Sequence, residues 1–401
     1  MNVLFLLKNL DVGGVEVVSA VLANKFVLMG HRVFIFALEQ TDLLIKDRLN
    51  KEVNVIFGSG FNADKQNVLL LKKIFVENDI NIVVNQWGLP FVPIRLIRKA
   101  GQELKVKVIS FHHNDPTANG KIKSVENELA GCRNPLKKCF LLIKKVLFKK
   151  ITSQSMKYTY KHSDMFMVLS EAYLPLLRNF IHVGNSNKQG VLVNPITIDV
   201  KGYSYCRQEK QKEIVFCGRV DFNQKRVHRL IEVWSFLETK FPDWQLTIVG
   251  DGDAKKDLEN QVNLMKLKSV RFEGFRKPLK YYRRASILAL TSEYEGFPLV
   301  LAECMSFGVV PCVYDSFAAV HDIIEDDVNG LIIEKENGYF SAEKMAMRLA
   351  EIMSDEQKLD MMAQKSIETS KRYSIDSVYE QWMENLTQLT KKDQTTKVEY
   401  Y

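Results

Sequence analysis

Short runs of apolar and β-branched residues alternate with helix-like segments along most of the chain. Strands that alternate with helices predict parallel β-sheets covered by helices on both faces. In the first half, the apolar spacing predicts a helix over residues 15–28, with Val17, Val18, Val21, Leu22 and Phe26 on one face. The strands expected there span residues 3–7, 32–37, 53–56, 80–84, 106–111 and 165–169.

The same alternation starts again after Asn194-Pro195-Ile196, which we interpret as a domain exit, and a polar linker at 201–213. The second half is expected to hold a helix over 230–240 and strands at 213–217, 245–249, 270–272, 287–290 and 309–313. A last helix is predicted over 374–389. The pattern therefore predicts an α/β protein with domains at 1–200 and 201–375, followed by a C-terminal helix and tail at 376–401.

Length and composition fit this organisation. The chain has 401 residues, 46% of them hydrophobic and 26% charged, as in globular proteins of two domains. No apolar run approaches the roughly 20 residues of a membrane-spanning helix, and Lys8 follows the run Val3–Leu7 too closely for a signal peptide. Six scattered cysteines without zinc-site spacing favour reduced core thiols in a cytoplasmic protein.

Two glutamates, Glu295 and Glu303, flank a predicted turn and helix start. An apolar run at 287–290 precedes the turn, Pro298 suits the first helical position, and Gly308 suits the helix end. Backbone N–H groups at a helix start bind phosphate oxygens. A carboxylate on each side of such a turn indicates a ligand with both phosphates and sugar hydroxyls.

The segment from Glu295 to Glu303 resembles the E-x7-E signature of retaining glycosyltransferase family 4, the group 1 glycosyltransferases. Its continuation through Gly308-Val309-Val310-Pro311, Asp315-Ser316 and Asn329-Gly330 is also similar to that family. The resemblance is specific in the C-terminal half and loose in the N-terminal half. It implies the GT-B fold, in which two Rossmann-like domains face a central cleft that holds the donor. The C-terminal helix would cross back to the N-terminal domain.

The resemblance also implies a diphosphate-binding loop. Gly218-Arg219 follows an expected strand, and Lys225 follows after five residues, where the family usually has four. We assign Arg219 and Lys225 to the donor diphosphate, because an enzyme without a metal needs cations at the leaving group. The resemblance implies an enzyme that works without a metal, so we expect no metal and no cofactor besides the nucleotide sugar as co-substrate. Arg226 stands where the family often has glycine, and its role stays open.

The two glutamates would have different roles. By resemblance, Glu303 binds the ribose hydroxyls, and Glu295 lies at the transferred sugar as the catalytic carboxylate; the sequence leaves open whether it acts covalently. The turn between them would bind phosphate through the backbone N–H groups of Phe297, Leu299 and Val300, while Pro298 has no N–H.

Three further elements resemble donor-binding parts of the family. Gly13 and Gly14 form a turn that lets the backbone approach the donor phosphates and the acceptor, although a plain β–α turn explains them equally. Phe275 and Arg276 follow a strand at the nucleobase position. His113, with His112 as the alternative, would hydrogen-bond the donor sugar. Residues 85–88 follow another strand and suit an acceptor loop.

A basic segment needs a separate explanation. Residues 121–161 hold eleven Lys or Arg and two Glu, a local charge of +9 in a chain of net charge +8. Within residues 134–151, five apolar side chains share one helical face: Leu136, Phe140, Ile143, Leu147 and Ile151. A basic amphipathic helix suits an anionic membrane surface. An ordinary helix with a solvated lysine face is the alternative, and the absence of aromatic interleaving argues against nucleic acid.

These features predict a retaining hexosyltransferase that uses a nucleoside diphosphate sugar, with UDP as the expected nucleotide. By resemblance to the family, its acceptor would be a saccharide or lipid-linked saccharide in bacterial surface polysaccharide synthesis, including lipopolysaccharide or capsule. We expect a cytoplasmic protein, peripheral at the inner face of the plasma membrane. The alternatives are a nucleotide-sugar epimerase or a phosphorylase of the same architecture, and a non-catalytic, membrane-docked binding module.

Overall fold

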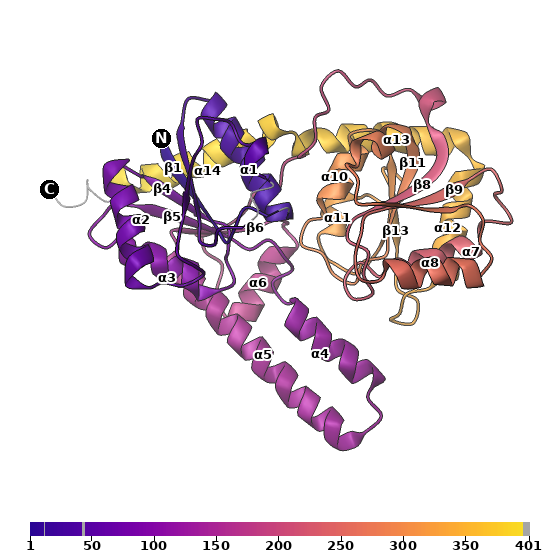
Figure 1. Ribbon diagram of the computed structural model, residues 1–401, viewed down its shortest axis with the longest axis horizontal. Helices are drawn as coiled ribbons and strands as arrows, with labels where there is room; N and C mark the ends of the chain where they lie inside the picture. The colour runs from indigo at the N-terminus through magenta and orange to yellow at the C-terminus, as the bar shows by residue number, and fades with distance from the viewer. Residues whose placement is uncertain (12, 42–44, 396–401) are drawn as a thin grey trace. The chain divides into compact units, whose positions relative to one another are not determined.

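The chain folds into two units, which we describe separately from a computed structural model (Figure 1). The structure describes residues 1–11, 13–41 and 45–395, so Val12 of the predicted glycine turn and the end of the predicted tail lie outside it. Unit 1 comprises residues 1–197 and the segment from Ile375 onward, and unit 2 comprises Ile198–Ser374.

Unit 1 is built on a seven-stranded parallel sheet in the order β3-β2-β1-β4-β5-β6-β7. Its strands are β1 Asn2–Leu7, β2 Arg32–Ala37, β3 Asn54–Phe57, β4 Ile82–Asn85, β5 Lys107–Phe111, β6 Met165–Val168 and β7 Gln189–Val191. Its helices are α1 Gly14–Leu28, α2 Lys65–Glu77, α3 Phe91–Ala100, α4 Gly120–Gly131, α5 Pro135–His162, α6 Tyr173–Ile181 and α14 Ile375–Thr395, with a 3₁₀ turn at Lys46–Arg48. The strand β1 is inaccessible to solvent from Val3 to Leu7, as expected for a central parallel strand covered on both faces.

Unit 2 has a six-stranded parallel sheet in the order β10-β9-β8-β11-β12-β13. Its strands are β8 Gln211–Cys217, β9 Gln245–Val249, β10 Val270–Gly274, β11 Ala285–Leu290, β12 Val310–Tyr314 and β13 Leu331–Ile333. Its helices are α7 Val227–Ser235, α8 Lys255–Leu264, α9 Leu279–Arg284, α10 Leu299–Met305, α11 Val320–Ile323, α12 Ala342–Ser354 and α13 Glu356–Ser370, with 3₁₀ turns at Arg207–Glu209 and Lys371–Tyr373. The parallel α/β architecture predicted from the sequence is confirmed.

The boundaries of some elements differ from the sequence-based expectations. The predicted linker at 201–213 contains the 3₁₀ turn and the start of β8 at Gln211. The helix expected to reach Lys240 ends at Ser235, and turns follow it. The three-residue strands β7 and β13 were not predicted, because each is shorter than the periodic run that identifies a strand.

The C-terminal helix α14 packs within unit 1, although the whole of unit 2 separates it from the rest of that unit in sequence. The Trp382 ring stacks on Phe111 at 5.1 Å between centroids, and Tyr379 meets Phe26 edge to face at 5.2 Å. The Lys25 ammonium lies 2.7 Å from the Asp376 carboxylate. The aromatic contacts bury one face of α14, so the helix is a structural part of the N-terminal unit.

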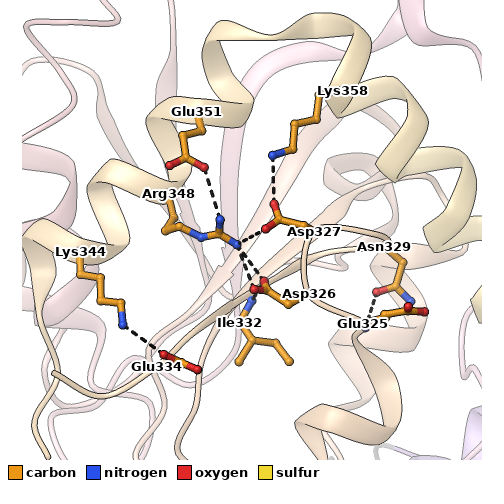
Figure 2. Close-up of polar contacts among 10 residues, drawn as sticks. All are labelled: Glu325, Asp326, Asp327, Asn329, Ile332, Glu334, Lys344, Arg348, Glu351 and Lys358. Carbon is orange, nitrogen blue, oxygen red and sulfur yellow. Dashed lines mark hydrogen bonds and ion pairs between the residues drawn. The ribbon is translucent and has the colours of Figure 1, made fainter.

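The turn before β13 is held by an ion cluster on unit 2 (Figure 2). The Arg348 guanidinium of α12 lies 3.0 Å from carboxylate oxygens of both Asp326 and Asp327, and Lys358 of α13 lies 3.0 Å from Asp327. Asp326 also accepts the backbone N–H of Ile332 at 2.8 Å. These contacts join two helices to β13, which is the edge strand of the sheet, three strands away from β8.

Helices α4 and α5 form a hairpin that extends away from the sheet of unit 1 (Figure 1). Asn134 caps α5 by accepting the backbone N–H groups of Leu136 and Lys137, and Pro135 occupies the start of the helix. The helix continues to His162, beyond the basic segment at 134–151. Among the described residues, no helix combines the length and the apolar character needed to cross a bilayer.

Candidate functional site

The candidate site on unit 2 lies where β8 and β11 end. These strands are hydrogen-bonded neighbours in a parallel sheet, so their C-terminal ends share one edge. Residues 218–226 follow β8, and residues 291–298 follow β11. Ligands of open α/β sheets bind outside this edge. The fold therefore brings together two segments that lie about 70 residues apart in sequence.

Asp221 organises the loop after β8. One carboxylate oxygen accepts the backbone N–H groups of Asn223, Gln224 and Lys225 at 2.9, 2.6 and 3.0 Å. The other accepts Nε of Arg219 at 2.8 Å. Burial by itself would raise the pKa of Asp221, but the hydrogen bonds from Arg219 and the backbone outweigh it and lower the pKa. The charged carboxylate of Asp221 thus holds the loop in shape through these hydrogen bonds.

Lys225 points from this loop to the carboxylate of Glu295. Its ammonium lies 2.5 Å from Oε1 of Glu295, and the two side chains are only 17% and 6% exposed. The Ser292 hydroxyl donates to the same carboxylate oxygen at 2.6 Å. The structure thus places a cation, a carboxylate and a hydroxyl at one shielded point.

Arg219 is more exposed, with 62% of its side chain accessible to solvent. Its second terminal nitrogen donates to the amide oxygen of Gln224 at 2.9 Å. Gln224 in turn links the two loops, since its backbone oxygen accepts the N–H of Glu293 at 2.7 Å. The guanidinium is therefore held at the edge with an open side that an anion can reach.

Arg226 follows Lys225 in the loop and pairs with Glu293. It has a left-handed backbone conformation, with φ of 52°, immediately before α7. Its guanidinium lies 3.5 Å from Glu293, which also pairs with Arg229 at 2.9 Å. Arg226 thus takes part in an ion pair beside the loop, and its role toward the diphosphate stays a prediction.

Gly250, which follows β9, allows the loop after β8 to lie against the backbone at the end of β9. A Cβ atom at this position would stand 1.8 Å from the backbone oxygen of Gly218, and its φ of 149° is one that other residues rarely adopt. Any larger residue would push the loop that carries Arg219 and Lys225.

The turn between the two glutamates leads into α10. Pro298 is the residue before the helix, one position earlier than predicted, and Leu299 and Val300 open the helix. Phe297 is 7% exposed and its ring meets Tyr373 edge to face at 5.2 Å. Glu303 lies within α10 and is 5% exposed. The side chains of Phe297 and Glu303 are thus largely packed in the unit, while Glu295 shares its site with Lys225.

Phe275 and Arg276 lie just past β10, which is separated from β8 by β9. Both are exposed, Phe275 to 72%. They share the C-terminal edge of the sheet with Arg219, because all these strands run parallel. An exposed aromatic ring here has little structural contact to explain it.

In unit 1, Gly13 and Gly14 begin α1. Gly13 is the residue before the helix, and a Cβ atom there would stand 2.2 Å from a carboxylate oxygen of Glu16. Glu16 is 9% exposed, and burial raises its pKa. The glycine therefore makes room for a buried carboxylate at the start of the helix, a contact that the sequence pattern did not reveal.

His113 lies past the end of β5 and contacts the segment after β4. Its Nε2 lies 2.6 Å from the amide oxygen of Gln86, so Nε2 donates and Nδ1 is left as an acceptor. Burial lowers the pKa of His113 to about 3, which keeps the ring neutral. Nδ1 of His113 and Nε1 of Trp87 are buried with no hydrogen-bond partner among the described residues. Each of the two residues thus keeps one buried polar atom without a hydrogen bond.

His112 is placed differently. It is 5% exposed, burial lowers its pKa to about 4, and its Nε2 lies 3.4 Å from the backbone oxygen of Asp115. Since His112 contacts its own loop and His113 keeps an open nitrogen, the geometry favours His113 of the two. The sequence predicted Gln86 only as part of an acceptor loop, and it predicted no role for Asp221 or Ser292.

Comparison with protein families gives two matches. Residues 204–369 match the model described as glycosyl transferases group 1, and residues 12–196 match glycosyltransferase family 4. Together the two models cover most of the chain, and each falls within one half of it.

Curated relatives are similar over parts of the chain. A glycosyltransferase of Haemophilus influenzae is 29% identical over 221 residues, which is 55% of this chain and 60% of that protein. The amylovoran biosynthesis glycosyltransferase AmsD of Erwinia amylovora is 29% identical over 43% of this chain and 47% of its own length. An alpha-1,4-N-acetyl-D-galactosaminyltransferase of Campylobacter jejuni, named for a saccharide on PP-undecaprenol, is 26% identical over 45% of this chain and 49% of its own length. The match thus spans about half of the length of each of these three relatives.

Solved structures show the same fold. HepE of Anabaena, determined in complex with UDP, aligns with a TM-score of 0.74 and 15% identity, over 97% of this chain and 100% of HepE. At this identity the likeness concerns the fold alone. The predicted GT-B architecture is confirmed by this likeness and by the two parallel sheets. The chain therefore belongs to the group 1 glycosyltransferases of the GT-B fold.

Proposed function

We propose that this protein is a retaining, metal-independent hexosyltransferase that takes its sugar from a nucleoside diphosphate donor, with UDP as the nucleotide. The observation that carries the proposal is the meeting of Arg219, Lys225 and Glu295 at one edge of the sheet of unit 2. Two cations and a carboxylate meet the needs of a reaction that breaks the bond from the anomeric carbon to a diphosphate oxygen.

The cations act on the leaving group. As the anomeric C–O bond breaks, negative charge grows on the departing diphosphate, and positioned donors that match this charge stabilise the transition state. The exposed guanidinium of Arg219, held by Asp221 and Gln224, supplies one of those donors. The ammonium of Lys225 supplies the other, and Asp221 accepts the backbone N–H of the same residue. The preorganised loop reduces the cost of reorganisation when charge develops.

The carboxylates act on the sugar and the ribose. We assign Glu295 to the positively charged face of the oxocarbenium-like sugar or to one of its hydroxyls, and Glu303 to the ribose. Phe275 and Arg276 are proposed for the nucleobase, and the backbone from Phe297 to Val300 for phosphate. Gly13, Gly14 and His113 are assigned to the donor from the family resemblance, which the open Nδ1 of His113 supports.

The comparisons support the substrate classes. HepE is a UDP-bound structure, and the Campylobacter relative is named for an acceptor linked through a pyrophosphate to undecaprenol. AmsD is named for amylovoran biosynthesis. We therefore propose a saccharide or lipid-linked saccharide acceptor and a role in surface polysaccharide synthesis, at the inner face of an anionic membrane that the segment 134–151 contacts.

A donor screen tests the proposal. The melting temperature is measured with UDP-glucose, UDP-galactose, UDP-N-acetylglucosamine, GDP-mannose and UDP, because a ligand that binds only the folded protein raises its apparent stability. At least one UDP-sugar is expected to stabilise the wild type and not Arg219→Ala. Arg271→Ala, an exposed arginine of the same unit, is the control and should respond like the wild type.

Turnover separates the rival functions. Slow release of UDP from the stabilising sugar nucleotide, abolished in Arg219→Ala and retained in Arg271→Ala, supports the transferase. Interconversion of two UDP-sugars without any acceptor would identify an epimerase instead. Binding without UDP release, with or without added saccharides, would identify a non-catalytic module. Retention is read from the anomeric configuration of the product by NMR.

A further inference from the structure

The α4–α5 hairpin has one apolar face that is already covered. Leu141 of α5 is 2% exposed, and Ile122 and Val125 of α4 are each 1% exposed. The Lys145 ammonium lies 2.9 Å from Glu126, which joins the two helices at the side of this contact. The hairpin therefore needs no additional partner on the face between its helices.

A second apolar face of α5 is uncovered. Five large side chains spaced three or four residues apart share this face and have the exposed fractions Leu136 82%, Phe140 64%, Ile143 63%, Leu147 52% and Ile151 57%. Val146 is also 65% exposed. Single exposed apolar residues are ordinary, whereas a continuous row of this length marks an interaction surface.

The charge around this row selects the partner. Residues 134–151 contain six lysines and no aspartate or glutamate. Lys137, Lys138 and Lys150 are exposed, and the Lys144 ammonium lies over the Phe148 ring at 5.8 Å. An anionic bilayer offers negative charge at its surface and an apolar interior directly beneath it. A nucleic acid offers the charge without the apolar layer.

We infer that α5 is a monotopic membrane anchor, whose row from Leu136 to Ile151 enters one leaflet of an anionic bilayer while its lysines contact lipid headgroups. The helix lies along the surface, with apolar side chains buried by roughly 5–10 Å. The inference rests on the proposed function in one respect only: membrane contact would give the enzyme access to a lipid-linked acceptor. The membrane contact itself is inferred from the exposed apolar side chains and the lysines of α5.

Sedimentation with vesicles of phosphatidylglycerol and phosphatidylcholine tests insertion, with full-length protein and no nucleotide sugar. The variant carries Leu136→Gln, Phe140→Gln, Ile143→Gln and Leu147→Gln, all at exposed positions. Its vesicle binding is expected to fall roughly 100-fold or more. The matched control carries Leu28→Gln, Leu69→Gln, Val76→Gln and Leu264→Gln at equally exposed positions of other helices, and should bind as the wild type does.

A second pair of variants tests the charge. Lys137→Glu, Lys138→Glu and Lys150→Glu should weaken binding strongly, because each lysine near an anionic surface contributes roughly fivefold. Lys51→Glu, Lys65→Glu and Lys72→Glu make the same change in net charge elsewhere and should matter much less. Raising the salt concentration should remove only part of the wild-type binding, since insertion of apolar side chains is not screened.

Several results would overturn the inference. The glutamine variant and its control could bind vesicles equally well, or the two charge variants could lose vesicle binding to the same extent. The wild type could bind pure phosphatidylcholine vesicles as strongly as anionic ones. The wild type could also form a dimer in solution that the glutamine variant abolishes. UDP release from UDP-glucose by the α5 variants is measured separately and should equal that of the wild type. If the wild type releases UDP but does not bind vesicles, the membrane anchor is refuted and the proposed chemistry is not. If it binds vesicles but does not release UDP, the proposed chemistry is refuted and the membrane anchor is not.

Discussion

The ammonium of Lys225 lies 2.5 Å from the carboxylate of Glu295, and both side chains are shielded from solvent. The sequence assigned these residues to different parts of one donor, Lys225 to the diphosphate and Glu295 to the sugar. The contact places the two residues at one point at the edge of the sheet. In our account, the pair holds both side chains in position, so that the anomeric carbon of the bound donor lies beside Glu295 and its diphosphate lies beside Lys225.

Replacement of Lys225 is expected to damage both catalysis and stability. Lys225→Ala removes a donor to the leaving group, for which a loss of roughly 10²–10³-fold in kcat is typical. It also leaves Glu295 buried without its cation, at a cost of roughly 3–5 kcal/mol in the free energy of unfolding. UDP release and denaturant unfolding measure the two effects.

The double variant separates them. Lys225→Met with Glu295→Gln removes both charges, so much of the lost stability should return while the activity stays low. Recovery of activity together with stability would mean that Lys225 acts only through folding.

Asp221→Ala is expected to loosen the loop after β8. Three backbone N–H groups and the guanidinium of Arg219 lose their acceptor, and unsatisfied buried groups cost roughly 1–3 kcal/mol. Because Arg219 then loses its orientation, the concentration of UDP needed for half-maximal thermal stabilisation should rise. Asp253→Ala, at a nearby aspartate outside these hydrogen bonds, is the comparison. Unchanged UDP binding in Asp221→Ala would show that Arg219 does not depend on the loop.

Acidification should destabilise the protein through its buried histidines. Burial lowers the pKa values of His113 and His112 to about 3 and about 4, below the ordinary value of 6.5. As the pH falls below about 6.5, the unfolded chain takes up these protons before the folded one does, so the free energy of unfolding decreases. Each histidine contributes a slope of about 1.4 kcal/mol per pH unit in that window, and the contribution is absent above it.

His113→Asn removes one of the two groups that take up a proton on unfolding, so this variant tests the contribution of His113 to the pH dependence. The melting temperature is followed from pH 7.5 to pH 4.5, and its decline should be shallower in the variant than in the wild type. Parallel curves for the two proteins would refute a neutral, buried His113.

The sequence predicted the sheets well because parallel strands buried on both faces are continuous apolar runs, as in β1 and β11. It could not show that Trp382 stacks on Phe111, since nothing local links residues 271 positions apart. The helix α4 was missed because much of it faces solvent and only Ile122 and Val125 are buried.

The candidate site was predictable where a motif marks it and not where tertiary structure makes it. Arg219, Lys225, Glu295 and Glu303 were assigned by their resemblance to family motifs, and these roles remain predictions. Asp221 and Ser292 carry no motif, and their roles arise from hydrogen bonds that only the folded loops allow. The tautomer of His113 likewise depends on Gln86, which lies on a different strand end.

The rate of UDP release from the preferred UDP-sugar, measured in EDTA and again after addition of manganese, tests most directly whether side-chain cations alone stabilise the leaving diphosphate. The account predicts equal rates in both conditions for the wild type, and rates reduced roughly 10²-fold or more in Arg219→Ala whether or not manganese is present. Activity that vanishes in EDTA and returns with manganese, or full activity of Arg219→Ala in EDTA, would contradict it.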